Sequence, residues 1–127
     1  MRLLLALAAF FGIGTSASSA EPAPKHEEAV IVHFDYGQKD WAQFFGFEKT
    51  LEEAIAHAGV GEYDGNELAV DGSDGSMYMY GPDADTLFAV VKPRLLAASF
   101  LRNVVVTLRY GAVTDPAARQ TKVELTR

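Results

Sequence analysis

Histidine and aspartate alternate with apolar residues in segment 29–36, AVIVHFDY. This alternation predicts a strand in which His33 and Asp35 point to the same face, roughly 6 to 7 Å apart along the chain. An imidazole titrates near neutral pH, and a carboxylate beside it can accept or orient a proton. The pair could therefore act in acid–base chemistry, bind a ligand, or lie on an ordinary solvated strand face.

Other side chains join this pair if their strands are neighbours in one sheet. Segment 103–110, NVVVTLRY, places Thr107 and Arg109 on one face of a second strand. Tyr78 and Tyr80 alternate with two methionines in a third, and the sequence leaves open which pair shares the face with His33. Arginine and aromatic residues are common anchors of interfaces, so we predict a binding face. The alternative is a solvated face with ordinary cross-strand pairs such as Asp35–Arg109.

Acidic residues gather between positions 62 and 74, and they are Glu62, Asp64, Glu67, Asp71 and Asp74. Calcium needs several oxygens that converge on one point, and Asp71-Gly-Ser-Asp-Gly lacks the alternation and the closing glutamate of an EF-hand. Turn formation explains these residues without a metal, so we expect no metal site, with Asp71 and Asp74 as a weak candidate pair. Glu67 is a candidate binding residue. Glu62 and Glu67 could also form an acid–base pair, but no pattern fixes their separation.

Signatures of known enzyme chemistry are otherwise missing from the sequence. His26, His33 and His57 lack the spacing of a helical zinc site, and cysteine is absent. No nucleophile elbow, phosphate loop or dinucleotide fingerprint occurs, so no cofactor is expected. Trp41 and Tyr63 could stack on a sugar or serve equally well in the core.

Two hypotheses of different class follow from these residues. The first is a non-enzymatic binding domain that contacts a protein partner, or a second copy of itself, through the sheet face or the hairpin tip at 71–75. The second is a small hydrolase or ligand-binding protein that uses His33, Asp35 and Glu67 in a cleft.

The elements that must position these residues are predicted from periodicity. Strands are expected at 29–36, 67–70, 76–80 and 103–110, with a possible short edge strand at 121–125. Apolar residues at helical spacing predict a helix over 40–58, stopped by Gly59 and Gly61. A second helix begins after Pro82, with Asp83 as its N-cap, and Pro93 should kink it or end its regular part.

This order of elements predicts an α+β fold of the ferredoxin-like βαββαβ type. The sheet would be antiparallel, with four strands in the order 4-1-3-2 and both helices on one face. The helix-covered face should then hold Val30, Val32, Phe34, Val104, Val106 and Leu108.

Three segments carry a resemblance to known proteins. They are 60–67 (VGEYDGNE), 76–85 (SMYMYGPDAD) and 106–111 (VTLRYG). Together they resemble small bacterial proteins of uncharacterised function that have a ferredoxin-like domain, over about residues 29–111. The resemblance implies the fold and carries no activity or site residue with it.

The N-terminal segment indicates where the protein works. A basic start, an apolar run over 3–13 and small residues before Glu21 are typical of a secretory signal peptide cleaved after Ala20. The alternative is a buried N-terminal helix. We expect a periplasmic or secreted protein with a flexible lead-in at 21–28, one domain at 29–111 and a C-terminal tail at 112–127. The net charge of −6 and the expected export argue against nucleic acid and, after cleavage, against a membrane as partner.

Overall fold

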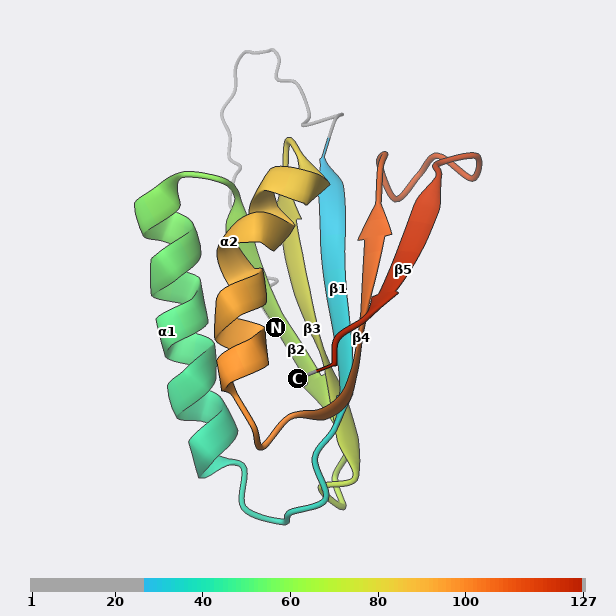
Figure 1. Cartoon of the computed structure of the whole chain (residues 1–127). Helices are drawn as coiled ribbons and strands as arrows, with labels where there is room; N and C mark the ends of the chain where they lie inside the picture. Colours follow the sequence, from blue (N-terminus) through green and yellow to red (C-terminus); the bar gives the residue numbers. More distant parts are fainter. Residues whose placement is uncertain (1–26, 127) are drawn as a thin grey trace, which may run out of the picture.

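The computed structural model describes residues 27–126, so the predicted signal peptide and most of the lead-in lie outside the described residues. The described chain forms an α+β fold with two helices and five strands (Figure 1). In chain order the elements are β1 (Glu28–Asp35), α1 (Ala42–Ala58), β2 (Glu62–Leu68), β3 (Asp74–Gly81), α2 (Ala84–Ala97), β4 (Arg102–Arg109) and β5 (Gln120–Glu124).

The strands form one open antiparallel sheet in the order β2-β3-β1-β4-β5. The predicted four-stranded sheet is therefore wrong in strand count, and its order gains β5 as a new edge beyond β4. The physical reason lies in the C-terminal segment, where Val123 and Leu125 are half-buried and pack against the core. Burial of these two apolar side chains stabilises the pairing of this segment with β4, so the segment joins the sheet.

Both helices lie on the same side of the sheet, and β5 extends beyond the area they cover (Figure 1). In β3, and in β1 from Val30 onward, buried residues that face the helices alternate with more exposed residues. The predicted helix-covered set is confirmed, because all six of its members are buried: Val30, Val32, Phe34, Val104, Val106 and Leu108. Met77 and Met79 join them from β3. The core therefore lies between this face and the helices.

The helix ends agree largely with the capping residues predicted from the sequence. Asp83 caps α2, with its Oδ1 accepting a hydrogen bond from the Thr86 amide at 3.1 Å. Gly59 ends α1 in the left-handed conformation at φ 67°. Pro93 does not end α2, which continues to Ala97.

The β2–β3 hairpin differs from its prediction. β2 begins at Glu62 and ends at Leu68, so the run predicted at 67–70 is displaced, and Val70 lies fully exposed at the tip. Asn66 follows a register shift between Tyr63 and Gly65, which is a bulge near the start of the pair. The strand starts earlier than predicted because β3 offers it a continuous pairing edge.

The hairpin tip forms backbone hydrogen bonds with the segment that follows β1. The carbonyl oxygen of Gly72 accepts hydrogen bonds from the amides of Gly37 and Gln38, at 2.7 and 3.2 Å. Gly72 has φ +79°, and a Cβ there would collide with the Gln38 carbonyl oxygen. The loop is therefore held in one position by its neighbours.

Neither helix within residues 27–126 is long and apolar enough to cross a membrane.

Candidate functional site

The sheet face opposite the helices, called the open face below, collects alternate residues of all five strands. Its middle row runs from Tyr78 through Ile31 and Thr107 to Lys122, in register across four strands. The tyrosines of β3 therefore lie on this face, which the sequence left undecided. The other members are Glu62, Glu67, His33, Asp35, Asp74, Ser76, Tyr80, Val105, Arg109, Gln120 and Glu124.

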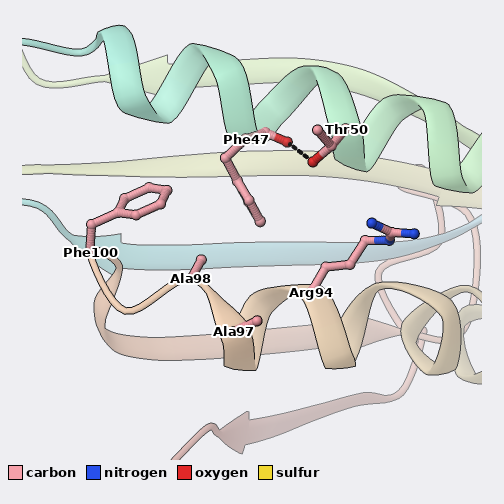
Figure 2. A pocket seen from close by; sticks show the side chains of 6 residues that line it. All are labelled: Phe47, Thr50, Arg94, Ala97, Ala98 and Phe100. Atoms are coloured by element: carbon pink, nitrogen blue, oxygen red, sulfur yellow. Dashed lines mark hydrogen bonds between the residues drawn. The ribbon is translucent and has the colours of Figure 1, made fainter.

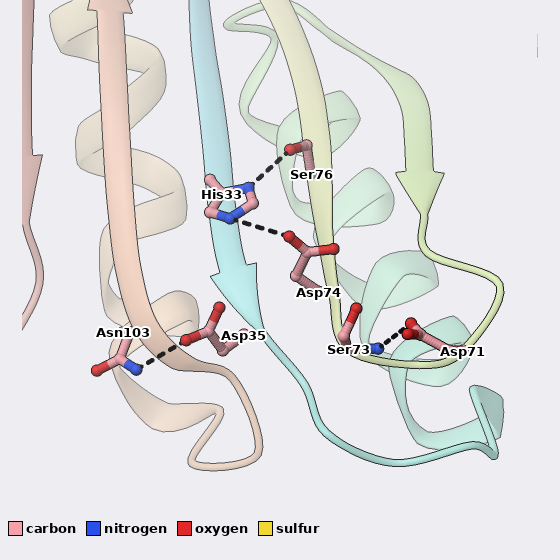
Figure 3. Close-up of polar contacts among 7 residues, drawn as sticks. All are labelled: His33, Asp35, Asp71, Ser73, Asp74, Ser76 and Asn103. Atoms are coloured by element: carbon pink, nitrogen blue, oxygen red, sulfur yellow. Dashed lines mark hydrogen bonds and ion pairs between the residues drawn. The ribbon is translucent and has the colours of Figure 1, made fainter.

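His33 lies between two polar side chains of β3 (Figure 3). Its Nδ1 is 3.2 Å from Ser76 Oγ, and its Nε2 is 3.5 Å from Asp74 Oδ2. The register explains the contacts, because Ser76 is the cross-strand partner of His33 and Asp74 lies two residues before it. The sheet thus brings together a hydroxyl, an imidazole and a carboxylate.

These three residue types are those of a Ser-His-Asp triad, so their geometry decides what they can do. The side chains of His33 and Asp74 are 50% and 45% exposed, in contrast to the buried, water-excluding setting that gives a triad its strength. A hydrolase also needs amide donors aimed at a developing oxyanion, and Ser76 lies within a strand whose amides serve the sheet. The arrangement is that of a polar cross-strand cluster able to bind a partner through hydrogen bonds.

Asp35 lies at the same end of the open face, directly across from Asp74. Two facing carboxylates repel each other, and each has a separate polar neighbour. Asn103 donates to Asp35 Oδ2 at 2.8 Å, while His33 approaches Asp74 (Figure 3). The predicted cross-strand pair Asp35–Arg109 is wrong, because the alignment of β1 with β4 places Arg109 opposite Ala29 and Asp35 opposite Arg102.

Tyr78 occupies the centre of the open face. Its hydroxyl donates to Glu67 Oε1 at 2.6 Å, across the β2–β3 pair. This hydrogen bond to a carboxylate is the main reason why the pKa of the Tyr78 phenol is raised above its ordinary value, and burial adds to it. Glu67 therefore fixes the ring of Tyr78 beside Ile31. These two residues and Thr107 form a half-buried row across β3, β1 and β4.

Arg109 serves chiefly the fold around it. It is only 8% exposed, its Nε donates to the Gly111 carbonyl oxygen at 2.8 Å, and its guanidinium lies 5.9 Å from the ring centre of Tyr80. Glu27 is nearby, and its pKa is raised above the ordinary value. Burial is the main cause, and the negative charges of Glu62 and Asp64 add to it, while the positive charge of Arg109 partly offsets the increase. This corner of the face is a compact charged cluster that offers a partner little free arginine surface.

The residues predicted for the hydrolase hypothesis are not brought together. His33 contacts Ser76 and Asp74, Asp35 contacts Asn103, and Glu67 contacts Tyr78. Glu67 is separated from His33 by β3, since each of them is a cross-strand partner of Ser76. The geometry gives these three side chains no common target.

The loop considered for calcium is stabilised by its own hydrogen bonds. Asp71 Oδ1 accepts from the Ser73 amide at 3.0 Å, and hydrogen bonds from Ser73 lower the pKa of the Asp71 carboxyl (Figure 3). Among residues 27–126, no group of three or more His, Cys, Asp or Glu side chains has the arrangement of a metal site. Turn formation thus accounts for Asp71, while Asp74 is engaged with His33.

Sequence reasoning missed Asp74 as a neighbour of His33, and also Ser76 and Asn103. Asp74 and Ser76 alternate with Tyr78, so the period of β3 could have placed them on the open face once its register was known. Asn103 could not have been found, because it depends on the β1 register shift and on its own φ of +50°. The two sugar-stacking candidates are engaged internally: Trp41 stacks on Tyr36 at 4.1 Å, and Tyr63 donates to Glu48.

Comparisons with known proteins identify no relative. No family model matches the chain, and no curated protein and no solved structure matches it either. The site is therefore interpreted from its own geometry.

Proposed function

We propose that this chain is a non-enzymatic protein-binding domain whose contact surface is the centre of its open face. The supporting observation is the row of Tyr78, Ile31 and Thr107, three half-buried neighbours on adjacent strands. Exposed polar side chains, His33 and Lys122 among them, border this row. A half-buried centre that holds an aromatic ring and an aliphatic side chain, with a polar rim around it, agrees with the usual anatomy of a protein interface. The partner is a different protein or a second copy of the chain.

We also propose that the fold is of the ferredoxin-like type. The order β1-α1-β2-β3-α2-β4 and the placement of both helices on one face support a ferredoxin-like domain with β5 as an added edge strand. Such a domain leaves one sheet face uncovered by helices, which is the surface that the proposal uses.

We also propose that the domain acts outside the cytoplasm. The support is the sequence pattern of residues 1–20, with its apolar run and its small residues before Glu21. N-terminal sequencing of the protein recovered from the periplasm or medium should then begin at Glu21. Recovery of a chain that keeps Met1, in the cytoplasm alone, would contradict export.

The binding proposal is tested by comparing two triple variants of the chain. One replaces His33, Tyr78 and Lys122 on the open face with alanine. The matched control replaces Gln43, Glu53 and Lys92, which are exposed on the two helices, with alanine. Each form is immobilised for capture from an extract of the source cells, and its self-association is measured by sedimentation velocity.

We expect the wild type and the helix control to behave alike, either by retaining the same partner or by forming the same dimer. The open-face variant should lose this association at least tenfold while keeping its circular dichroism spectrum. An association that survives in the open-face variant, or is lost equally in the helix control, would show that the surface lies elsewhere. A wild type that neither captures a protein nor self-associates would refute the proposal.

A further inference from the structure

A small pocket lies between the two helices, on the side of the molecule away from the open face (Figure 2). Its volume is about 260 Å³. Phe47 of α1 and Phe100 of the loop after α2 form its aromatic walls, with their ring centres 5.8 Å apart and their planes near perpendicular. Ala97 and Ala98 lie at the end of α2, where their short side chains leave the space between the helices unfilled.

One cation borders this apolar space. Arg94 of α2 lines the pocket one helical turn before Ala97, and no acidic residue is among the lining side chains. Within residues 27–126, the Arg94 guanidinium has no hydrogen-bond or ion-pair partner, and its side chain is exposed. The remaining polar lining residue, Thr50, donates its hydroxyl proton to the Phe47 carbonyl oxygen at 2.8 Å (Figure 2). The polar group available to a ligand is therefore the guanidinium.

We propose that this pocket binds a small carboxylate that has an aromatic or branched apolar body. The apolar body would lie against this pair of phenylalanine rings, on the side that faces Arg94, where aromatic contacts are favourable. The carboxylate would accept two parallel hydrogen bonds from the Arg94 guanidinium, an arrangement that suits the planar geometry of both groups. Arg94 thus selects for a negative charge, and the phenylalanines select for the body attached to it.

The size of the pocket limits the ligand. A volume of 260 Å³ corresponds to about nine water molecules and lies just below the usual range for small-molecule sites. A single ring with a short acidic side chain fits this space, whereas a long acyl chain or a peptide does not. This site is separate from the open face in position and in chemistry, so it does not depend on the proposed function.

The test uses two probes of nearly equal shape on the full chain. 3-Phenylpropionate carries the negative charge, and 3-phenylpropionamide replaces it with a neutral amide. Binding is measured by titration calorimetry and by shifts of the backbone amide resonances of α1 and α2. We expect 3-phenylpropionate to bind at least about tenfold more tightly than the amide, because hydrogen bonds to charged groups are the stronger ones.

Four variants locate the site. Arg94→Gln should weaken 3-phenylpropionate binding at least about tenfold and abolish the preference over the amide, whereas Arg94→Lys should keep part of the preference. Ala97→Leu should fill the pocket and reduce the binding of both probes. The matched control is Lys92→Gln, which removes the same charge from the same helix outside the pocket lining and should change nothing.

Several results would overturn the inference. They are equal affinity for the acid and the amide, full binding by Arg94→Gln, an effect of Lys92→Gln as large as that of Arg94→Gln, or no binding by the wild type at millimolar probe. If Ala97→Leu fails to fold, the two Arg94 variants decide the question alone, because Arg94 is an exposed residue. The open-face variant should bind 3-phenylpropionate like the wild type, which distinguishes failure here from failure of the proposed function.

Discussion

Glu48 is the residue that joins α1 to β2 through polar contacts. One of its carboxylate oxygens accepts hydrogen bonds from both the Tyr63 hydroxyl and the Asn66 side-chain amide. Burial, followed by the bond to Glu48, raises the pKa of the Tyr63 phenol, so this hydroxyl stays protonated and continues to donate at neutral pH. The contact therefore gives the Glu48 carboxyl group a half-buried donor from β2.

Removing this donor should destabilise the fold without disturbing its surface. Tyr63→Phe should lower the free energy of unfolding by about 1.5 to 3 kcal/mol, the usual range for a hydrogen bond to a charged group. Urea denaturation measures this loss. Glu53→Gln, at an exposed position of the same helix, is the control and should stay within about 0.5 kcal/mol of the wild type. A Tyr63→Phe protein as stable as the control would mean that Asn66 and water satisfy Glu48 alone.

Gly72 in the hairpin tip and Gly46 in α1 affect stability in opposite ways, although the sequence does not distinguish them. Gly72 sits at φ +79° in the hairpin tip, where a Cβ would meet the Gln38 carbonyl oxygen. Gly46 lies in α1 with no heavy atom within 4 Å of the position that a Cβ would occupy. The first is required by the backbone, and the second only lowers the helical propensity of α1.

The same substitution should therefore have opposite effects at these two positions. Gly72→Ala should cost at least about 2 kcal/mol, because it adds a steric collision to an unfavourable backbone conformation. Gly46→Ala should stabilise the chain by about 0.5 to 1 kcal/mol. Thermal melting of the two variants beside the wild type measures both changes. A Gly72→Ala protein with an unchanged melting temperature would show that the tip can separate from segment 36–38.

Elements governed by a local period were predictable, and contacts set by register were not. The alternation in β1 fixed which of its residues are buried, and Asp83 and Gly59 marked helix ends through local hydrogen bonding. The contact of His33 with Asp74 depends on how β1 and β3 align, which no single segment encodes. β5 joined the sheet because of distant core contacts, so its own short pattern indicated it only weakly.

The whole molecule is held together without a disulfide, since the sequence contains no cysteine. Phenols instead make contacts within the core, within the sheet and between the sheet and the helices. Tyr36 belongs to the aromatic cluster of the core, Tyr63 joins α1 to β2, and Tyr78 crosses β2 and β3. Tyr110, after β4, donates to Asp85 of α2 at 2.6 Å. The hydrogen bonds of Tyr63, Tyr78 and Tyr110 require a protonated hydroxyl, and the ring contact of Tyr36 requires that its side chain stays buried.

The pKa values of these four phenols are raised in the folded chain. Burial is the main cause for Tyr36 and Tyr63, and the hydrogen bonds to Glu67 and Asp85 are the main causes for Tyr78 and Tyr110. In the unfolded chain these groups lose their protons near pH 10. Their contribution to stability is therefore fully present below about pH 10 and is lost as the pH rises through the folded values.

The molecule should accordingly unfold cooperatively at alkaline pH. Above about pH 10, each raised phenol should lower the free energy of unfolding by up to about 1.4 kcal/mol per pH unit. Tyrosinate absorbance at 295 nm should then rise in the same pH range in which the circular dichroism of the fold disappears. The chain in concentrated urea is the control and should titrate near pH 10. Full ionisation near pH 10 with an intact fold would show that these phenols are replaceable, and that burial of the apolar core alone holds the helices on the sheet.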